Sequence, residues 1–583
     1  MPERHSDSEE TSGRNSGKGL QIGLGKATLA PTQQGPAMMG WAMLHNVARS
    51  ARTPLHARAF ILDDGRKRIA FVVSEILAVS DSIRQRLVAR LENEAPELGL
   101  EDAHLCLMAT HTHSGPGGYF HYPLYNLTIP GFVESTLDAM VDMIFRALVE
   151  ACATMAPGRV RFAARPFALD VPVAFNRQPG AHARNAEVDD ALAKDPARAL
   201  DRTMRQLQFE DLEGSVRGVL NWFAVHGTSV HSDNHALHFD NKGYAAQMME
   251  HRLGPGCVAG FAQGGAGDVT PNVTKHPGRP WTRGESIDDD ESARINGGYQ
   301  CRQSAALLDA AANEPHLEPT LDCHFAYVDF SDIEVAPEYA DGKPGRRTGP
   351  AEIGWAKLFG TEEGPGIPRK LLFSQKLGQG VQSVLRRVAL RGESSKARAT
   401  VQGPKLTVLE VGRRKVAGVS RIRNLPIPFG VHPAVDQLIA LDQSSLYDPR
   451  PWTQQIIPLQ IIRIARVAIV AVPAEFTTQA ARRLRRSVAD KLGIALDDVV
   501  LSGYSNAYCG YVTTPEEYEL QNYEGASTHF GVWTLGAYQS TFDRLVDGRL
   551  DPELRPPAFR DEDLAGRRYQ TPPELEGAKC EQH

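Results

Sequence analysis

The chain has 583 residues, of which 42% are hydrophobic and 23% charged, a composition that is ordinary for a globular protein. Its 64 basic and 70 acidic residues give a formal charge of −6, which argues against nucleic acid as the main partner because nucleic-acid binding calls for a basic face. The strongest apolar stretch, from Ile461 to Phe476, is interrupted by Arg463 and Arg466. Its uninterrupted part, from Val467 to Pro473, is far shorter than the roughly 20 residues that span a bilayer, so no transmembrane segment is predicted.

The cysteines and the N-terminus bear on the cellular compartment. Seven cysteines are scattered along the chain without a CxxC pair, which is typical of reduced thiols rather than of a disulfide framework. Residues 1–19 are polar and carry acidic side chains, so they lack the apolar core of a signal peptide and are predicted to be disordered. Together these features predict a cytoplasmic protein.

Strand-like apolar runs alternate with helical patterns from about Leu20 onward, which predicts an α/β fold with a mixed β-sheet core and surrounding helices in one large catalytic unit. In chain order we expect a hairpin of strands at 58–62 and 68–73 around an Asp-Asp-Gly turn, a helix at 81–98, a strand at 104–110, a helix at 132–155, strands at 219–225 and 467–472, a helix at 476–492, a strand at 499–503 and a last helix at 526–545. The polar segments 274–300 and 337–368 are expected to be long loops, and 546–583 an extended C-terminal tail.

Histidine follows two of the predicted strands, at the point where each strand ends. Residues 109–118 read ATHTHSGPGG; in extended backbone His111 and His113 point to the same side, and imidazole is the commonest metal ligand. Residues 221–229 read NWFAVHGTS and place His226 at the end of an apolar run, where a histidine needs a hydrogen bond or a metal. Alone, the first segment is equally compatible with an ordinary solvent loop, and for His226 a hydrogen-bonded core histidine is the more common case.

Two more polar segments come after predicted strands nearer the C-terminus. Residues 471–478 read AVPAEFTT, so Glu475 stands between an apolar strand and a helix, where it binds a metal or interacts with the helix N-terminus. Residues 505–514 read SNAYCGYVTT and offer Tyr508 and Tyr511, for which ordinary packing is the alternative.

The shared position of these segments favours one site. In α/β sheets, ligands bind beyond the carboxyl ends of the strands. Two histidines and one glutamate with an open position form the ligand set of a catalytic zinc. We therefore infer a zinc centre at which the four strand ends converge.

At these residues the sequence resembles the catalytic domain of the neutral (non-lysosomal, neutral/alkaline) ceramidase family. The matching segments are THTHSGPGG (110–118), NWFAVH (221–226), GDVTPN (267–272), VPAEFTT (472–478) with RRLR (482–485), YVTTPEEY (511–518) and YEGAST (523–528), together with GLGKAT (23–28) and MMGW (38–41). Several long motifs in one order are far more specific than any single one. The resemblance implies a ceramidase-like zinc-hydrolase domain at 20–545.

Members of that family hydrolyse the amide bond of ceramide to a sphingoid base and a fatty acid, using one zinc ion per chain. Matched residue by residue, the resemblance implies that the zinc ligands are His111, His226, Glu475 and Tyr511. It implies catalytic roles for His113, Arg177, Thr270 and Tyr511. Arg177 matches an arginine that holds polar groups of the substrate, and Thr270 stands where the family has a serine.

The chemistry expected of such a centre rests on general principles. Zinc lowers the pKa of a bound water to about 7 and polarises the amide carbonyl. Arg177 and Tyr511 are expected to donate to the oxyanion that develops, and His113 to carry a proton to the leaving amine. Thr270 keeps the hydroxyl group of the family's serine, which leaves it a positioning role.

Several features depart from the family pattern or stay open. The family's C-terminal β-sandwich and the secretion signal of many members are expected to be absent. His231, His235 and His238 have the spacing of one helical face, so a second metal site is open, with more weight on a solvated loop. The segment YFHYPLY at 119–125 fits an apolar groove beside the metal or packing of a loop onto the core.

Three functional hypotheses result, and the sequence predicts no oligomeric state. The first is a zinc-dependent amide hydrolase with ceramide or a related N-acyl lipid as its substrate, in peripheral contact with a lipid surface and with no nucleic-acid partner. The second is a zinc hydrolase of another N-acyl amide or ester on the same scaffold. The third is a lipid-binding protein that has lost catalysis, against which the retention of all four candidate ligands argues.

Overall fold

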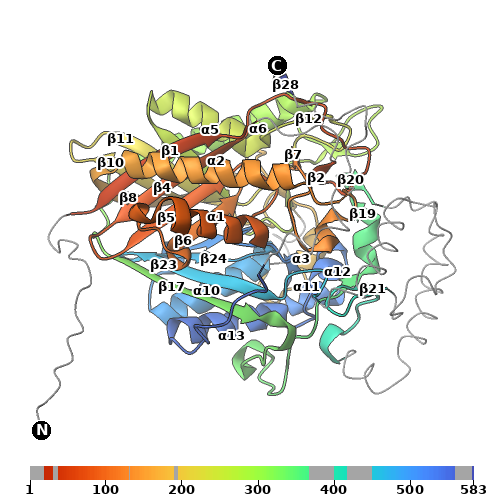
Figure 1. The fold of residues 1–583 in the computed structure, drawn as a ribbon. Coiled ribbons are helices and arrows are strands. Elements are labelled where there is room, and N and C mark those ends of the chain that lie inside the picture. Colours follow the sequence, from red (N-terminus) through yellow and green to blue (C-terminus); the bar gives the residue numbers. More distant parts are fainter. Residues whose placement is uncertain are drawn as a thin grey trace, which may run out of the picture.

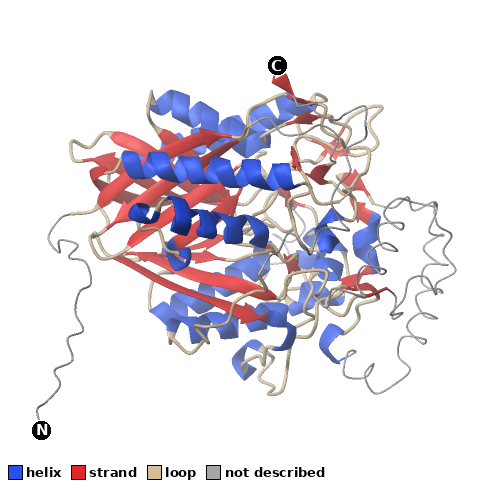
Figure 2. Cartoon of the chain, in the orientation of Figure 1, coloured by secondary structure: helices blue, strands red, loops and turns tan. Residues whose placement is uncertain are grey.

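The computed structural model describes residues 19–30, 37–129, 131–189, 195–366, 400–416, 450–558 and 581–582. Two mixed β-sheets lie at its centre, with helices on their outer faces (Figure 1 and Figure 2). The larger sheet has the strand order β13 (Val258–Gln263), β11 (Val216–Phe223), β10 (Thr203–Asp211), β8 (Ala156–Pro166), β1 (Gln21–Thr28), β4 (His56–Asp63), β5 (Arg68–Ser74) and β6 (Leu105–Ala109). The smaller sheet has the order β17 (Leu321–Asp329), β23 (Ile456–Ile464), β24 (Val467–Ala471) and β26 (Val499–Ser502).

Side-chain alternation along the strands builds the layers. On β4, Ala59 and Ile61 belong to a core shared with the helices that cover the larger sheet, whereas Phe60 and Leu62 pack between the two sheets. The covering helices are α1 (Asp81–Glu94), α2 (Glu134–Ala153), α5 (Asp240–Leu253) and α6 (Asp289–Ala311). The smaller sheet packs its other face on α10 (Thr478–Leu492) and α13 (Thr534–Val546). The order of layers is therefore helix, sheet, sheet, helix, which confirms the predicted α/β class.

Close contact between α2 and β1 depends on glycine. A Cβ on Gly23 would lie 2.1 Å from the carbonyl oxygen of Ala151, and one on Gly25 would lie 2.3 Å from that of Ala147. Only residues without a side chain let the helix lie this close to the strand. The helix thereby covers the middle of the larger sheet (Figure 1).

Most predicted elements are present, and two predictions are wrong. The strands β4 and β5 form the expected antiparallel hairpin, and the strands at 104–110, 467–472 and 499–503 are β6, β24 and β26. The predicted helix at 526–545 is two helices, α12 (Tyr523–Ser527) and α13, with Gly531 between them at a φ of 100° that ordinary residues avoid.

The predicted loop at 274–300 is the second error. It contains a small hairpin, β15 (Thr274–Lys275) with β16 (Thr282–Arg283), and the first half of α6. Its acidic run is a helix start: the side chain of Asp288 accepts a hydrogen bond from Glu291 N at 2.9 Å, and the first turn holds Asp289, Asp290 and Glu291. Negative charge there is favourable because the helix dipole is positive at its N-terminus.

Short elements fill the remaining described segments. The small ladders pair β2 (Met38–Gly40) with β7 (Ser114–Pro116), β9 (Phe175–Asn176) with β14 (Val269–Thr270), β19 (Gly360–Thr361) with β20 (Gly364–Pro365), β25 (Glu475–Phe476) with β27 (Tyr511–Val512), β3 (Ser50–Ala51) with both β12 (Ala236–Leu237) and β28 (Glu581–Gln582), and β21 (Thr407–Glu410) with both β18 (Ile353–Gly354) and β22 (Lys415–Val416). The short helices are α3 (Pro179–His182) and α11 (Pro515–Glu519), with 3₁₀ turns at Pro96–Leu98, Asp102–His104, Pro123–Asn126, Phe330–Asp332, Pro337–Tyr339, Trp355–Phe359 and Leu496–Asp498. The segment 337–368, as far as residue 366, is thus a series of short elements.

Predictions for the chain ends fall mostly outside the described part. Residues 1–18 of the predicted disordered segment and 559–580 of the predicted C-terminal tail belong to the segments that the structure does not describe. Within the described ranges, no helix has both the length and the apolar character needed to cross a membrane.

Candidate metal centre

Three of the predicted metal ligands meet beyond the carboxyl ends of strands from both sheets. His111 follows β6, His226 follows β11, and Glu475 follows β24. The Oε2 atom of Glu475 lies 3.2 Å from His226 Nε2 and 3.7 Å from His111 Nε2. All three side chains are buried, so the strand ends converge as the sequence predicts.

Backbone carbonyls orient both imidazole rings and select the tautomer of their neutral form. His111 Nδ1 lies 2.7 Å from Leu77 O, and His226 Nδ1 lies 2.9 Å from Val269 O. A carbonyl oxygen only accepts hydrogen bonds, so we assign the proton of each neutral ring to Nδ1. Each Nε2 is then left with a lone pair that faces Glu475, as in metal-binding histidines whose other nitrogen donates to a carbonyl.

His113 belongs to the same group of side chains. Its Nε2 lies 3.1 Å from His111 Nε2, and its ring is only partly buried. His111, His113 and His226 each offer a nitrogen within 4.8 Å of the others. The sequence predicts a catalytic role for His113, and the structure places it among the residues that are able to hold a metal.

The donor set fits a metal ion. Several nitrogen lone pairs and a carboxylate oxygen face one another in a buried space. They repel one another electrostatically, and a cation bound between them would remove this repulsion. In a tetrahedral zinc site the ligands lie about 2.0–2.1 Å from the ion and hence about 3.3 Å from one another, close to the spacing found here. His111 also has a φ of 68°, and such strained backbone is typical of functional sites.

The ionisation states suit the same role. Burial lowers the pKa of His111 to about 4, so the ring is neutral at pH 7 and able to bind a metal. Burial opposes ionisation of Glu475, but the nearby His111 and His226 and the hydroxyl of Tyr508 outweigh it and hold the pKa of that carboxyl well below its usual range. Glu475 is therefore an anionic ligand at neutral pH.

Tyrosines surround Glu475. The hydroxyl of Tyr504 donates to Glu475 Oε2 at 3.0 Å, and that of Tyr508 donates to Oε1. Tyr511, the predicted fourth ligand, is paired with Glu475 across β25 and β27, and its hydroxyl accepts from Arg177 Nη2 at 3.4 Å. Tyr504 is not among the residues predicted from the sequence, and nothing in the pattern around it distinguishes it from a packing residue.

Arg177 is held by two buried carboxylates beside the centre. Its Nε donates to Glu524 Oε1 at 2.8 Å, and its Nη1 to Glu363 Oε1 at 3.3 Å. Burial raises the pKa of Glu363, but Arg177 and other donors outweigh this effect, so the pKa stays below its usual value. Neither carboxylate is predicted from the sequence, although Glu524 lies in the YEGAST motif and Glu363 in the long segment at 337–368.

Thr270 lies next to this network. Its hydroxyl accepts from Asn272 N at 2.8 Å, and its side chain also favours the ionised form of Glu363. The preceding carbonyl, that of Val269, is the one that fixes His226. Thr270 is thus placed to act through neighbouring residues.

The histidines at 231, 235 and 238 do not form a helical face, nor a solvated loop. His231 is buried and stacks on Trp41, with ring centroids 5.2 Å apart, and Trp41 in turn packs edge-on against His113 at 5.2 Å. His238 is buried and lies 2.9 Å from Asp290 Oδ1, at the start of α6. His235 Nδ1 lies 3.2 Å from Val47 O. The three rings have separate partners.

The aromatic segment at 119–125 packs onto the core. Tyr119, Phe120 and Tyr122 are buried, and the hydroxyl of Tyr119 donates to Ala78 O at 2.9 Å. Tyr125 bonds to Tyr508 O at 3.1 Å and thereby supports the loop of the tyrosines around Glu475. The sequence left open an apolar groove beside the metal or packing of the loop onto the core, and the structure shows packing onto the core.

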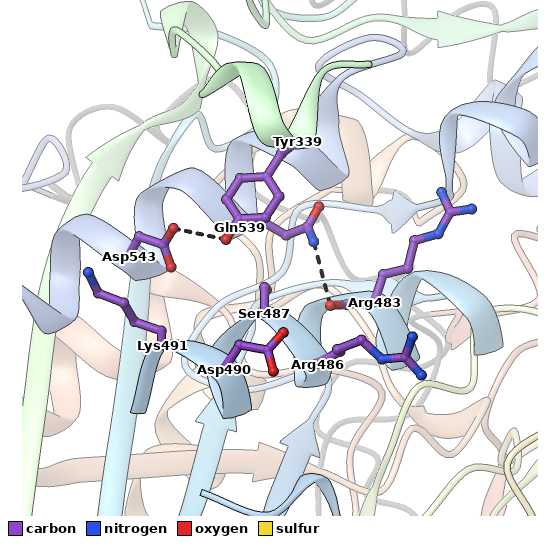
Figure 3. Close-up of a pocket in the computed structure, with 8 residues that line it drawn as sticks. All are labelled: Tyr339, Arg483, Arg486, Ser487, Asp490, Lys491, Gln539 and Asp543. Carbon is purple, nitrogen blue, oxygen red and sulfur yellow. Dashed lines mark hydrogen bonds between the residues drawn. The ribbon is translucent and has the colours of Figure 1, made fainter. Parts of the chain in front are cut away.

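A separate surface cavity of about 260 Å³ lies between α10 and α13 (Figure 3). Its wall includes the bonded pair Tyr339 and Asp543, joined at 2.9 Å, and charged groups of both signs such as Arg486 and Lys491. None of the residues predicted for the metal centre lines it.

Comparison with known proteins agrees with this geometry. Residues 20–427 and 431–540 match the family model of neutral/alkaline non-lysosomal ceramidases, N-terminal region. The chain belongs to this family. It is 32% identical over 533 residues to the neutral ceramidase of Pseudomonas aeruginosa, covering 90% of this chain and 71% of that protein, and 32% identical over 544 residues to the neutral ceramidase of Mycobacterium tuberculosis, covering 91% and 77%.

Solved structures show the same relationship. The crystal structure of neutral ceramidase from Pseudomonas aeruginosa matches with a TM-score of 0.73 at 30% identity, over 93% of this ceramidase-family chain and 77% of that one. A ceramidase complexed with C2 matches with a TM-score of 0.76 at 31% identity over the same shares. These matches confirm the predicted family and fold class, and the candidate ligand groups suit a metal-dependent family.

Proposed function

We propose that this protein hydrolyses the amide bond of ceramide to a sphingoid base and a fatty acid, using one zinc ion at the centre of His111, His226 and Glu475. The main support is the convergence of two Nε2 atoms on one carboxylate oxygen, at 3.2 and 3.7 Å, in a chain of the ceramidase family. The neutral ceramidases to which the chain is similar support the choice of substrate.

Zinc fits the donor set. His111, His226 and Glu475 would hold it, with Tyr511 as the fourth ligand that the family resemblance implies. A zinc ion bound there supplies Lewis acidity toward the amide carbonyl and a water molecule with a pKa of about 7. Nitrogen and carboxylate ligands without cysteine favour a catalytic over a closed structural zinc site.

Two donors are placed to stabilise the oxyanion that forms on the amide carbonyl. The guanidinium of Arg177 and the hydroxyl of Tyr511 lie side by side, 3.4 Å apart. Glu363 and Glu524 fix the guanidinium in position before the substrate arrives. Donors that are already oriented cost little reorganisation during the reaction, which is the main advantage of an oxyanion site.

Hydrolysis of an amide forms a bond from water oxygen to the carbonyl carbon and breaks the bond to nitrogen, so a proton must pass from the water to the leaving nitrogen. His113 is suited to carry it because its Nε2 faces the centre and its side chain is partly exposed. Thr270 positions the network through Glu363 and does not need to act as a nucleophile.

The test is to incubate the purified, zinc-loaded protein with ceramide and to measure fatty acid and sphingoid base by mass spectrometry. Equal amounts of both products would support the proposal. Faster release from short N-acyl amines or esters than from ceramide would favour the second hypothesis. Ceramide binding without product would favour a lipid-binding protein.

A cytoplasmic location is also proposed. The support is the set of cysteines in the described part of the chain, which are free thiols, as expected in a reducing compartment. Fractionation of cells that express the full-length protein tests this location.

A further inference from the structure

A second group of potential metal ligands lies apart from the centre described above. His182 is the last residue of α3, Asp268 lies between β13 and β14, and Glu517 lies on α11. One ligand atom from each side chain lies within 4.8 Å of the other two. All three residues are buried, although they come from distant parts of the chain.

The two carboxylates are oriented by neighbouring donors but are not saturated. Asp268 Oδ1 accepts from both the backbone N and the hydroxyl of Thr478, and Oδ2 accepts from Asn176 at 2.8 Å. Glu517 Oε2 accepts from Thr477 and from Thr514 N, and Oε1 accepts from Asn185 at 3.0 Å. Each carboxylate has room for about four such contacts, so one lone pair on Asp268 Oδ2 and one on Glu517 Oε1 remain.

His182, the histidine of this group, has an unsatisfied ring nitrogen. The residue is only 4% exposed, and its Nδ1 is buried without a hydrogen-bond partner. A buried polar atom of this kind normally has a partner, and an orphaned one calls for an explanation such as an ion. An imidazole with an unpartnered nitrogen and two carboxylates with spare acceptor capacity therefore lie together in one buried place.

The negative charges of Asp268 and Glu517 are also not fully balanced by the side chains around them. Burial raises the pKa of Asp268, and burial together with the nearby carboxylate of Asp268 raises the pKa of Glu517 to about 7. Arg177 favours the ionised form of Asp268, but its guanidinium is already paired with Glu363 and Glu524. A divalent cation would offset both negative charges.

We propose that His182, Asp268 and Glu517 form a second divalent-cation site, in addition to the single zinc predicted from the sequence. One imidazole with two carboxylates suits Zn²⁺ or Mn²⁺ better than the all-oxygen sites of Ca²⁺ and Mg²⁺. The ion would have a structural role, because Asp268 bonds to Thr478 N at the start of α10 and immediately precedes Val269, whose carbonyl fixes His226. The ion would take no direct part in the proposed reaction.

The test counts zinc ions per folded chain after chelation, reloading with Zn²⁺ alone and removal of excess metal, by elemental analysis and native mass spectrometry. We expect about two ions in the parent and about one in His182→Leu, which removes the nitrogen but keeps a side chain of similar bulk. His226→Ala should also hold about one, and the double variant His182→Leu/His226→Ala about none.

A matched control removes a histidine that faces a single carboxylate. His316 Nε2 lies 2.9 Å from Glu210 Oε2, outside either group, and His316→Leu should keep the parent's metal content. If His182→Leu does not fold, Glu517→Gln decides, since it keeps the size of the side chain and one acceptor oxygen and loses the charge. An undiminished count in the folded His182 or Glu517 variant would overturn the proposal, and so would a single ion in the parent that His182→Leu keeps and His226→Ala loses. Loss of ceramide hydrolysis with two ions still bound would count against the proposed function alone.

Discussion

Glu475 and Tyr511 are paired in register on the short parallel strands β25 and β27, where Glu475 N donates to Gly510 O at 2.9 Å. Side chains of residues paired in this way leave the ladder on the same side. The pairing therefore places the carboxylate at the metal centre beside a phenol that contacts Arg177 at 3.4 Å. It joins the metal-binding half of the site to the half that supplies donors.

Tyr511→Phe should lower kcat by about 10²-fold or more, with a smaller effect on KM, because the phenol donates to charge that develops in the transition state. Zinc content should fall less than in His226→Ala, since His111, His226 and Glu475 remain. Steady-state kinetics on zinc-loaded protein measures both constants. A large rise in KM at unchanged kcat would instead make Tyr511 a residue for substrate binding.

Tyr508→Phe should weaken the binding of zinc. The sequence leaves ordinary packing open for Tyr508, but in the structure its hydroxyl donates to Glu475 Oε1, where it orients the carboxylate. Loss of such a contact typically weakens metal affinity by about 10-fold or more. Competition with a zinc chelator measures this affinity, and kcat at saturating zinc should stay near that of the parent. Unchanged affinity would remove Tyr508 from the support of the centre.

Thr270→Ser should keep activity, and Thr270→Ala should lose part of it. The hydroxyl accepts from Asn272 N and favours the ionised form of Glu363, which in turn orients Arg177. Loss of a positioning contact should reduce kcat/KM by about 10-fold, equal to about 1.4 kcal/mol in the barrier. Comparison of the two variants with the parent on ceramide is the measurement. An alanine variant with parental kcat/KM would make Thr270 purely structural.

Glu75→Gln should destabilise the fold by about 3–5 kcal/mol at pH 7, because it leaves the buried guanidinium of Arg58 without one of its two carboxylate partners. Burial opposes ionisation of Glu75, but Arg58, at 2.6 Å, outweighs it, and the pKa of Glu75 falls from 4.5 to about 2. A carboxyl whose pKa is lower in the folded state stabilises the fold above its unfolded pKa and loses this effect as the pH falls through its folded pKa. The difference between parent and variant should therefore be constant above about pH 5 and shrink toward pH 2.

Urea unfolding at several pH values measures this difference. The exposed pair of Arg90 and Glu94, at 2.9 Å, provides the control, because Glu94→Gln should change stability by less than about 1 kcal/mol. A similar effect of the two substitutions would show that burial does not strengthen the ion pair of Glu75.

The sequence predicted correctly those helices and strands whose apolar pattern and turn signals lie within a few residues of one another. The hairpin of β4 and β5 has strongly apolar strands around a turn signal, and the strands before His111 and Glu475 are short apolar runs that allow few other structures. The start of α6 was missed because its acidic residues resemble a loop by composition, whereas their helix-capping role depends on the helical residues that come after them in the chain.

The residues of the candidate site likewise fall into those that the sequence could predict and those that only the tertiary fold reveals. His111, His226 and Glu475 stand out because a polar ligand at the end of an apolar strand is unusual. Glu363 and Tyr504 could not be predicted, since their roles depend on contacts with Arg177 and Glu475 that only the tertiary fold creates. The contacts of His231 with Asp289, at 3.6 Å, and of His238 with Asp290, at 2.9 Å, were missed because both aspartates belong to the unexpected start of α6.

Ceramide hydrolysis at the metal centre is tested by the release of fatty acid from ceramide by the zinc-loaded protein, compared with its folded His226→Ala variant. We expect equal amounts of fatty acid and sphingoid base from the parent, no turnover after chelation, recovery on addition of Zn²⁺, and no turnover by the variant. Intact ceramide after incubation with folded, zinc-loaded parent, or equal release by parent and variant, would refute hydrolysis at this centre.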